Sequence, residues 1–193
     1  MKTKGIYFLY RVLQALAIPA LLLYFLYRGL ADRRYWRSLP QRFGFLPRPL
    51  RQTGPGAIWL HAVSVGEVLS CLEFLRRLRA EFPATRIFVS VSTLAGRDTA
   101  GQKLNGLADG VFFAPVDYVF AVRRVLRALR PSAVLIAETE IWPNLFHGCR
   151  DRKIPLILAG ARIDPAAARW YRRLRRFFTP VLASASAILT VDA

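Results

Sequence analysis

The sequence is poor in acidic residues and in cysteine, and both shortages narrow what the chain can be. Only 12 aspartates and glutamates accompany 29 lysines and arginines. The two cysteines, Cys71 and Cys149, show no metal-binding or redox spacing, which argues against a disulfide scaffold and suits a reducing compartment. No G-x-G-x-x-G run follows the first apolar strand and no Walker A loop occurs, so binding of a dinucleotide or a nucleoside triphosphate by those devices is unsupported. We expect no bound cofactor and no metal.

Positive charge is what the chain has in excess, with a formal net charge of +17 at pH 7 that is carried almost wholly by arginine. Such a surface attracts polyanions, and the candidates are nucleic acid, anionic lipid headgroups and phosphorylated small molecules. At 193 residues the chain suits one compact domain with an appendage, and its core needs no disulfide or metal in order to form.

An apolar run at residues 5–27 helps to decide between these partners. It is about long enough to cross a bilayer, carries a single charge (Arg11) and has tyrosine and phenylalanine at both ends. Pro19 is expected to kink it. A signal peptide is the competing interpretation, but a basic flank at 28–34 follows the run in place of a cleavage site. Because this flank is more basic than the residues before the run, the positive-inside rule predicts a downstream domain in the cytoplasm.

We predict that residues 1–30 form a helix that anchors the chain to a membrane, either spanning it or lying in its interface. A buried core helix is the alternative. A second basic stretch, at 169–178, interleaves arginines with aromatic residues. It predicts either a helix that lies against anionic lipid or a solvated face beside a packed stripe. With an anchor present, the basic surplus indicates an anionic membrane surface rather than nucleic acid.

Residues 31–56 are interpreted as a basic connector punctuated by proline and glycine, and residues 57–193 as the folded domain. In that domain, short apolar strands alternate with helical patterns. The expected strands are 57–63, 86–92, 111–114, 133–137, 154–159 and 187–191. The expected helices are 68–82, 97–104, 121–129, 144–152 and 164–178, the last with Asp164 as its N-cap. The alternation predicts an α/β fold, a Rossmann-like parallel sheet with helices on both faces and ligands at the carboxyl ends of its strands.

The most informative segment is 57–67, in which an apolar strand ends in a small-residue turn and Glu67 opens the next helical pattern. A carboxylate in a first helical turn lies at the positive end of the helix dipole, which favours its ionised form. There it accepts a proton or hydrogen bonds without donating any. Glu67 is accordingly either a proton acceptor or a cap of the helix, and its spacing leaves both roles open.

Other polar residues follow the remaining strands and are expected at the same edge of the sheet. They are Ser64 and Gly66 after the first strand, Ser92, Thr93 and Gly96 after the second, Asp117 after the third, Glu138, Glu140 and Asn144 after the fourth, and Gly160 and Arg162 after the fifth. Glu140 either belongs to a site, caps the next helix or pairs with Arg162. His61 is expected to be a structural histidine. Because His61 and Ser64 point to opposite faces of an extended segment, hydrolase chemistry is disfavoured.

Several of these motifs, taken together, resemble one protein family. They are His61-Ala-Val-Ser-Val-Gly-Glu67, Glu138-Thr-Glu-Ile-Trp-Pro-Asn144, Ala161-Arg162, Thr93-x-x-Gly96, Pro115-x-Asp117 and Arg42-Phe-Gly44. In this order and spacing they resemble the N-terminal half of the 3-deoxy-D-manno-oct-2-ulosonic acid (Kdo) transferases of lipopolysaccharide assembly. The resemblance covers essentially the whole chain.

The resemblance implies the acceptor-side domain of a GT-B glycosyltransferase on the cytoplasmic face of the inner membrane. Such enzymes transfer Kdo from CMP-Kdo to a lipid A precursor (lipid IVA) and invert the anomeric centre. By this resemblance Glu67 is the general base, and Glu138 stabilises the transition state or positions the acceptor. The residues implied to bind the acceptor are Ser64, Gly66, Thr93, Gly96, Glu140, Asn144 and Arg162. Arginines of the connector and of the basic helix would hold the phosphates of the acceptor.

Three features depart from the family pattern. Gln41 stands where an acidic residue usually precedes the R-x-G motif, and Gly160 stands where an asparagine usually precedes Ala161-Arg162. The sequence stops at Ala193, where the family continues into the domain that holds the nucleotide of the donor, so we expect a truncated enzyme or one half of a split one. The alternative function is a non-catalytic, membrane-anchored module that binds lipid A phosphates or a partner protein.

Overall fold

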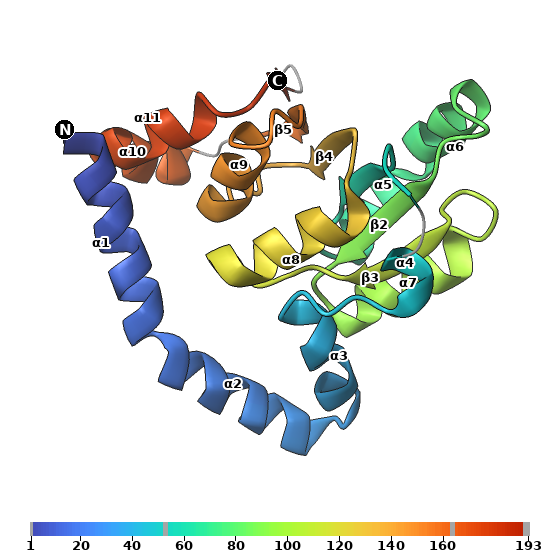
Figure 1. The fold of residues 1–193 in the computed structure, drawn as a ribbon, viewed down its shortest axis with the longest axis horizontal. Helices are drawn as coiled ribbons and strands as arrows, with labels where there is room; N and C mark the ends of the chain where they lie inside the picture. Colours follow the sequence, from blue (N-terminus) through green and yellow to red (C-terminus); the bar gives the residue numbers. More distant parts are fainter. Residues whose placement is uncertain (1, 52–53, 163–164, 191–193) are drawn as a thin grey trace.

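The computed structural model describes residues 2–51, 54–162 and 165–190. Within these ranges, six parallel strands form one sheet in the order β3-β2-β1-β4-β5-β6 (Figure 1). The strands are β1 (Ile58–His61), β2 (Ile87–Val91), β3 (Gly110–Phe113), β4 (Ala133–Ala137), β5 (Leu156–Ala161) and β6 (Ala187–Thr190). The expected α/β class is confirmed. The strand order reverses between β1 and β4, and ligands of doubly wound sheets bind in the crevice at such a point.

Helices in the described ranges precede the sheet and cover both of its faces. They are α1 (Lys2–Leu16), α2 (Ile18–Ala31), α3 (Arg34–Arg42), α4 (Arg48–Arg51), α5 (Val65–Ser70), α6 (Leu72–Glu81), α7 (Leu94–Lys103), α8 (Val119–Leu129), α9 (Pro143–Arg150), α10 (Pro165–Arg173) and α11 (Arg175–Leu182). The expected strands are all present, the fourth with its expected bounds and the others with described bounds that differ by at most two residues. Val191, at the end of the sixth expected strand, and the expected cap Asp164 lie outside the described residues.

Two of the expected helices are each divided into two. The one expected at 68–82 begins earlier, at Val65, because Ser64 is extended and the helix starts directly after it. It is then interrupted at Cys71, and the side chains of Val68 in α5 and Leu75 in α6 both reach the same apolar cluster. The helix expected at 164–178 is divided at Leu174 into α10 and α11, and it extends four residues further than expected, to Leu182.

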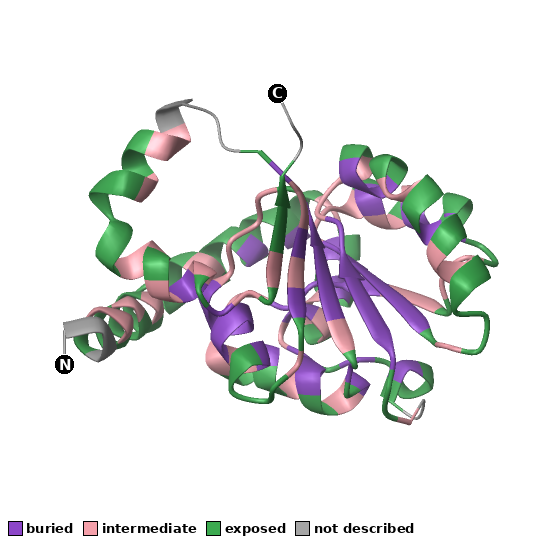
Figure 2. Cartoon of the chain, turned by 90° about the horizontal axis from the view of Figure 1, so that it is seen from above, coloured by how far each residue is buried: buried purple, intermediate pink, exposed green. Residues whose placement is uncertain are grey.

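Each face of the sheet has its own apolar core, because successive residues of a strand point to opposite faces. In β1, Trp59 packs with residues of α8 and α9, whereas Leu60 packs with residues of α5, α6 and α7. Figure 2 shows the central strands buried between these layers of helices. Trp59 is 1% exposed and Phe146, in α9, is 0% exposed. Truncating such a side chain to alanine typically costs about 3–5 kcal/mol, so these cores fix the strand ends that carry the polar motifs.

Helices α1 and α2 form an arm along the outside of the domain (Figure 1). Of the helices in the described part of the chain, none alone has the length and apolar composition of a membrane span, but Gly5–Leu16 and Ile18–Ala31, which meet at 45°, pass that test together. The break falls at Ala17 rather than at Pro19, which occupies the first turn of α2, where its missing N–H leaves no hydrogen bond unmade. The arm is not a buried core helix, since Leu16 is 72% exposed and Leu30 is 76% exposed.

The segment interpreted as a connector contains α3 and α4, and α3 covers the exposed edge of β3. The side-chain carbonyl of Gln41 accepts the N–H of Phe113 at 2.8 Å, and the carbonyl of Arg42 accepts the N–H of Val116 at 2.8 Å. The guanidinium of Arg42 is buried and donates to the carbonyl of Ser92 at 2.8 Å. An uncovered edge strand invites pairing with another chain, so this contact protects β3. Gln41 therefore serves the fold as a hydrogen-bond acceptor, a role that an acidic residue would also fill.

Candidate functional site

A cleft of about 490 Å³ lies at the carboxyl ends of β1, β4 and β5, on the side of the sheet covered by α5 and α6. Its walls are Leu60, Ser70, Cys71, Phe74, Ala137, Glu138, Ala159, Gly160 and Arg162. The floor is apolar, and the rim carries one acidic and one basic side chain. This is the place where the topology of the sheet predicts a ligand.

Glu67 lies in the first turn of α5, one helical turn before the cleft residues Ser70 and Cys71 but not itself in the cleft wall, and its carboxylate closes the turn that precedes it. The carboxylate accepts the N–H of Val63 at 2.5 Å and the hydroxyl of Ser64 at 3.2 Å. Glu67 is 8% exposed. The carboxylate thus braces the turn before α5 rather than an N–H of the helix itself, and lone pairs of both its oxygens stay free to accept a proton, because a carboxylate offers about four such positions.

Burial raises the pKa of Glu67 above the ordinary value of a glutamate. The hydrogen bonds from Val63 and Ser64 act in the opposite direction, and the negative charges of Glu138 and Glu140 add to the rise. The expectation from the helix dipole, that the ionised form is favoured, was wrong in direction because loss of water outweighs the dipole. A carboxylate with a raised pKa is the stronger base, which suits a group that removes a proton at neutral pH.

Glu138 follows β4 directly and has an unusual backbone conformation. Its φ is +60°, in the left-handed region that residues other than glycine rarely adopt. Its N–H still continues the sheet by donating to the carbonyl of Ala159 at 2.8 Å, and its side chain is exposed on the wall of the cleft. Such backbone strain is concentrated at functional sites, where it aims a side chain that regular geometry would direct elsewhere.

His61 and Glu140 are both held by Trp142. The indole N–H of Trp142 donates to the carboxylate of Glu140 at 2.8 Å, and the edge of its ring meets the imidazole of His61 at 5.0 Å between centroids. Nδ1 of His61 lies 2.8 Å from the hydroxyl of Ser90, whereas Nε2 is buried with no hydrogen-bond partner in the described part of the chain. Burial lowers the pKa of His61 to about 4, so the ring is neutral and structural at physiological pH. Among the ion pairs of the described residues, none joins Glu140 to Arg162.

Thr93 and Gly96 position the start of α7 against the turn that carries Glu67. The hydroxyl of Thr93 accepts the N–H of Gly96 at 2.9 Å and so caps α7. A Cβ added at Gly96 would lie 2.8 Å from that hydroxyl and 3.4 Å from the carbonyl carbon of Ser64. Gly66, in contrast, is exposed and has nothing near the position of a Cβ. Thr93 and Gly96 therefore support the turn at Ser64, and Gly66 lies on its open side.

We expect Thr93→Ala to lower the free energy of unfolding by about 1 kcal/mol, because the N–H of Gly96 loses its acceptor. Urea denaturation of the chain measures this loss. Thr99→Ala, inside the same helix, is the matched control and should be neutral or slightly stabilising, since alanine is the better helix former. Equal losses in the two variants would contradict the capping role of Thr93.

The remaining predicted site residues divide between the cleft and the arm. Arg162 is exposed on the rim of the cleft, and its N–H donates to the hydroxyl of Thr139 at 2.7 Å. Asn144 is 3% exposed and bonds to Gln14 of α1, which occupies its side chain. Gly160 has a φ of +75° beside an irregularity in the pairing of β5 with β6. Asparagine is among the few other residues that tolerate this conformation, so the departure at Gly160 preserves the backbone.

Three cleft residues and one buried acid had no assigned role from the sequence. Ser70, Cys71 and Phe74 line the cleft because the chain turns between α5 and α6, and helical periodicity gives no sign of that interruption. Burial raises the pKa of Asp117 to about 7, and its carboxylate accepts the N–H groups of Asn144 and Leu145 at the start of α9. In the sequence, the sign that Asp117 has partners in α1 is the set of polar side chains spaced along the apolar run 5–27. Among the described residues, no group of three or more His, Cys, Asp and Glu side chains could hold a metal ion.

Comparison of the sequence with known proteins matches the chain to one family of transferases. Residues 37–193 match a family model described as 3-Deoxy-D-manno-octulosonic-acid transferase (kdotransferase). The 3-deoxy-D-manno-octulosonic acid transferase of Haemophilus influenzae is 28% identical over 187 residues, which are 96% of this chain and 43% of that protein. That of Chlamydophila psittaci is 29% identical over 93% of this chain and 42% of its own length. A probable mitochondrial 3-deoxy-D-manno-octulosonic acid transferase of Arabidopsis thaliana is 33% identical over 86% of this chain and 36% of its own length. The chain therefore spans about two fifths of the length of these relatives.

Proposed function

The chain belongs to the Kdo transferase family, over its N-terminal domain, and from this premise we propose that it is the acceptor-side part of an inverting GT-B glycosyltransferase. The proposed reaction transfers Kdo from CMP-Kdo to a hydroxyl of a lipid A precursor, lipid IVA. The nucleotide of the donor would be held by sequence equivalent to the part of the relatives that this chain does not span.

The observation that carries the proposal is the placement of Glu67, a buried carboxylate with a raised pKa in the helical turn that leads to the cleft residues Ser70 and Cys71. In the proposed step, Glu67 removes the proton from the acceptor hydroxyl. The oxygen of that hydroxyl forms a bond to the anomeric carbon of Kdo at the same time. The bond from that carbon to the phosphate of CMP breaks, and CMP leaves with the electron pair. Attack on the face opposite the leaving group inverts the anomeric centre.

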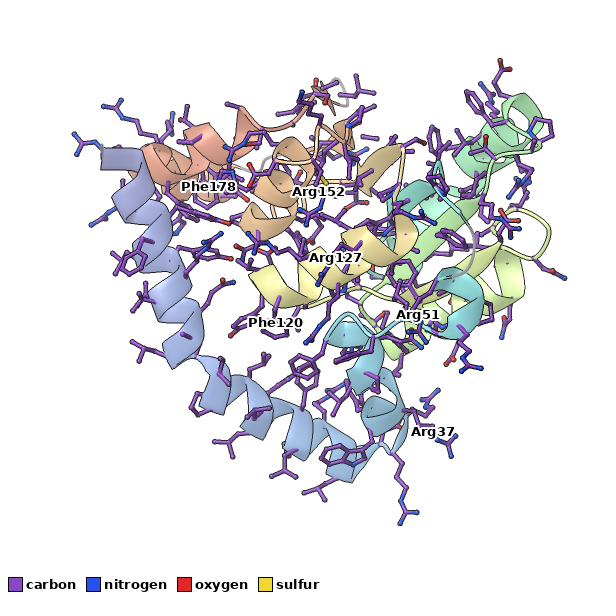
Figure 3. All side chains as sticks on the ribbon, in the orientation of Figure 1. Arg37, Arg51, Phe120, Arg127, Arg152 and Phe178 are labelled. Atoms are coloured by element: carbon purple, nitrogen blue, oxygen red, sulfur yellow. The ribbon has the colours of Figure 1, made fainter. Side chains whose placement is uncertain are left out.

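Glu138 and Arg162 are proposed to orient the acceptor, because both line the cleft and are exposed to it. A guanidinium on the rim suits the phosphate of a lipid A precursor, and an exposed carboxylate suits the hydroxyls of its sugars. Other arginines are spread over several elements, and Figure 3 labels Arg37 in α3, Arg127 in α8 and Arg152 after α9. A basic surface of this kind attracts anionic headgroups over a wide area.

We also propose that the arm attaches the protein to the cytoplasmic face of the inner membrane, where a lipid A precursor is accessible. The outer faces of α1 and α2 carry exposed apolar side chains: Phe8, Leu9, Leu13, Leu16, Leu22, Leu23, Leu26, Tyr27 and Leu30. In the basic helices, Trp170 is 63% exposed and Leu174 is 47% exposed beside the arginines of α10 and α11. Apolar and aromatic groups flanked by arginines match a helix that lies in the interface of an anionic bilayer.

The complete gene product, incubated with CMP-Kdo and vesicles that contain lipid IVA, tests this proposal. We expect the mass of the acceptor to increase by at least one Kdo residue and CMP to be released in equal amount. Binding of the vesicles without transfer would contradict the enzymatic proposal and favour the non-catalytic module.

The pH dependence of transfer gives an independent check of the general base. Since only ionised Glu67 accepts a proton, kcat/KM should fall as the pH falls, and the midpoint of this limb should lie above the ordinary glutamate value of 4.5 because burial raises the pKa. Glu138→Gln removes a negative charge that raises this pKa, so the limb should move to lower pH. Glu73→Gln, at an exposed position of α6, is the control and should leave the midpoint in place. If Glu138→Gln leaves the pH midpoint of the acidic limb unchanged, the assignment of this limb to Glu67 is contradicted.

A further inference from the structure

Helix α1 is amphipathic, but its apolar face points away from the domain and its polar face points toward it. A helix that covers a soluble core has the reverse arrangement. Its outer face carries Phe8, Leu9, Leu13 and Leu16, which are 55–72% exposed. The face that meets the domain is instead polar, and its side chains Tyr7, Tyr10 and Gln14 are spaced three and four residues apart, on one side of the helix. We call these three residues the polar stripe. Core-covering helices bury their apolar side, so a helix that docks by its polar side has another purpose.

The polar stripe binds two residues, Asp117 between β3 and α8 and Asn144 in the first turn of α9. The hydroxyl of Tyr10 donates to the carboxylate of Asp117 at 3.0 Å, and the hydroxyl of Tyr7 donates to the side-chain carbonyl of Asn144 at 2.5 Å. The amide of Gln14 donates to the carbonyl of Asp117 at 2.7 Å. Its own side-chain carbonyl accepts from the amide of Asn144 at 2.9 Å. All three members of the stripe therefore end on Asp117 or Asn144.

Asp117 connects the polar stripe to the start of α9. Its carboxylate accepts the N–H of Asn144 at 3.0 Å and the N–H of Leu145 at 3.0 Å, which are donors that the first turn of a helix cannot satisfy by itself. Rings support the same junction, since Tyr7 meets His147 of α9 at 4.3 Å and Tyr10 meets Phe177 of α11 at 5.1 Å between centroids. The first turn of α9 is thus held between Asp117 and the polar stripe.

The segment fixed in this way carries the acidic residues of the site. Residues 138–142 connect β4 to α9 and contain Glu138 and Glu140. One end is fixed to the sheet, where the N–H of Glu138 donates to the carbonyl of Ala159 at 2.8 Å. The other end enters α9, whose first turn α1 holds. The conformation of the acidic segment therefore depends on a helix more than 100 residues away in the sequence.

We propose that α1 is a latch for the candidate site: its polar stripe, docked on Asp117 and Asn144, holds residues 138–142 in place, and undocking of α1 releases them. Tyr10 and Gln14 are positioning residues in this scheme. The docked contact consists mainly of hydrogen bonds and ring edges rather than a large apolar surface, so it can open while the sheet stays folded. Binding of the outer face of α1 to another surface would then change the conformation of residues 138–142 as well. The effect on transfer rests on the proposed function, whereas the latch itself does not.

Amide hydrogen exchange on the chain in detergent micelles tests the latch without any assay of activity. In the double variant Tyr10→Phe, Gln14→Leu, we expect exchange at Asn144 and Leu145 to accelerate at least about tenfold, because Asp117 and Asn144 lose their bonds to Tyr10 and Gln14 and the first turn of α9 then opens more readily. Exchange at Leu60 in β1 and Leu135 in β4, which are both in the sheet, should stay unchanged. Leu13→Ala on the outer face of α1 is the matched control and should leave all four amides unchanged.

Three results would overturn the latch: unchanged exchange at Asn144 and Leu145, equal acceleration in β1 and β4, or the same acceleration in Leu13→Ala. In the complete gene product, the double variant should also lower kcat for transfer severalfold while KM for CMP-Kdo stays near its original value, because the acidic segment and not the donor is misplaced. Transfer that is unaffected while exchange accelerates would overturn the link to the site. If the unaltered protein shows no transfer at all, the proposed function fails, and the exchange measurement still decides the latch.

Discussion

Glu67→Gln is expected to lower kcat for Kdo transfer by on the order of 10²- to 10⁴-fold, the usual contribution of a general base. Glutamine keeps the size of the side chain, but it cannot take the proton of an acceptor hydroxyl. Its carbonyl can still accept the N–H of Val63, which Glu67 accepts at 2.5 Å, so the turn should keep its conformation. Rates are measured with CMP-Kdo and lipid IVA on the complete gene product, and urea denaturation of the same samples checks folding.

Glu73→Gln is the matched control for this substitution. Glu73 lies on α6, its side chain is 62% exposed, and its partners are Arg76 and Arg77 on the same helix. Surface pairs of this kind contribute little, so transfer should stay within about twofold of the original rate. Transfer by Glu67→Gln at a rate close to that of Glu73→Gln would remove Glu67 from the chemistry and leave it only its role in bracing the turn before α5.

Gly44→Ala is expected to have the largest effect on stability, a loss of about 2–5 kcal/mol. Gly44 has a φ of +87°, a left-handed conformation that costs alanine about 1–2 kcal/mol. A Cβ at this position would also lie 2.6 Å from the carbonyl oxygen of Ala121 and 2.8 Å from Cβ of Arg124 in α8, and overpacking of this kind adds about 1–3 kcal/mol. Urea denaturation of the chain measures the sum.

Gly106→Ala separates the two causes of that loss. Gly106 has a φ of +76°, but nothing lies within 4 Å of the position of its Cβ. It should therefore lose only about 1–2 kcal/mol, from the backbone alone. If the two variants lose the same amount, the close approach of Gly44 to α8 contributes nothing to stability, and the need for glycine at this position comes from its backbone conformation alone.

The parts of the fold that depend on short-range pattern could be predicted from the sequence. The strand at Ile58–His61 and the presence of a helix after it follow from an apolar run, a small-residue turn and helical periodicity, although the helix begins three residues earlier than expected, at Val65. Parallel pairing followed from the alternation of strands and helices, and it placed Glu67 and Glu138 at one edge of the sheet. The negative charges of Glu138 and Glu140 raise the pKa of Glu67, which agrees with that placement.

Interactions between distant segments, and the balance of opposing forces, could not be predicted. The family resemblance implied that Asn144 binds the acceptor, and nothing in the sequence indicated that its side chain bonds to Tyr7 and Gln14, which are 137 and 130 residues away. The sequence pattern around Tyr7 does not predict a contact with Asn144. The pKa of Glu67 required knowing how much water the fold removes, which neither its position in the helix nor its spacing reveals.

The most direct test of the account is a titration of the isotopically labelled chain, in micelles, with the bisphosphorylated glucosamine disaccharide of lipid A, followed by NMR. The account predicts that the amide signals of residues 63–67 and 138–142 shift together, with one saturation curve, and that the apparent pKa of the Glu67 carboxyl changes on binding. Shifts confined to the arginine-rich helices α10 and α11, with the signals of residues 63–67 unmoved, would contradict it, because the acceptor would then bind the protein without reaching Glu67.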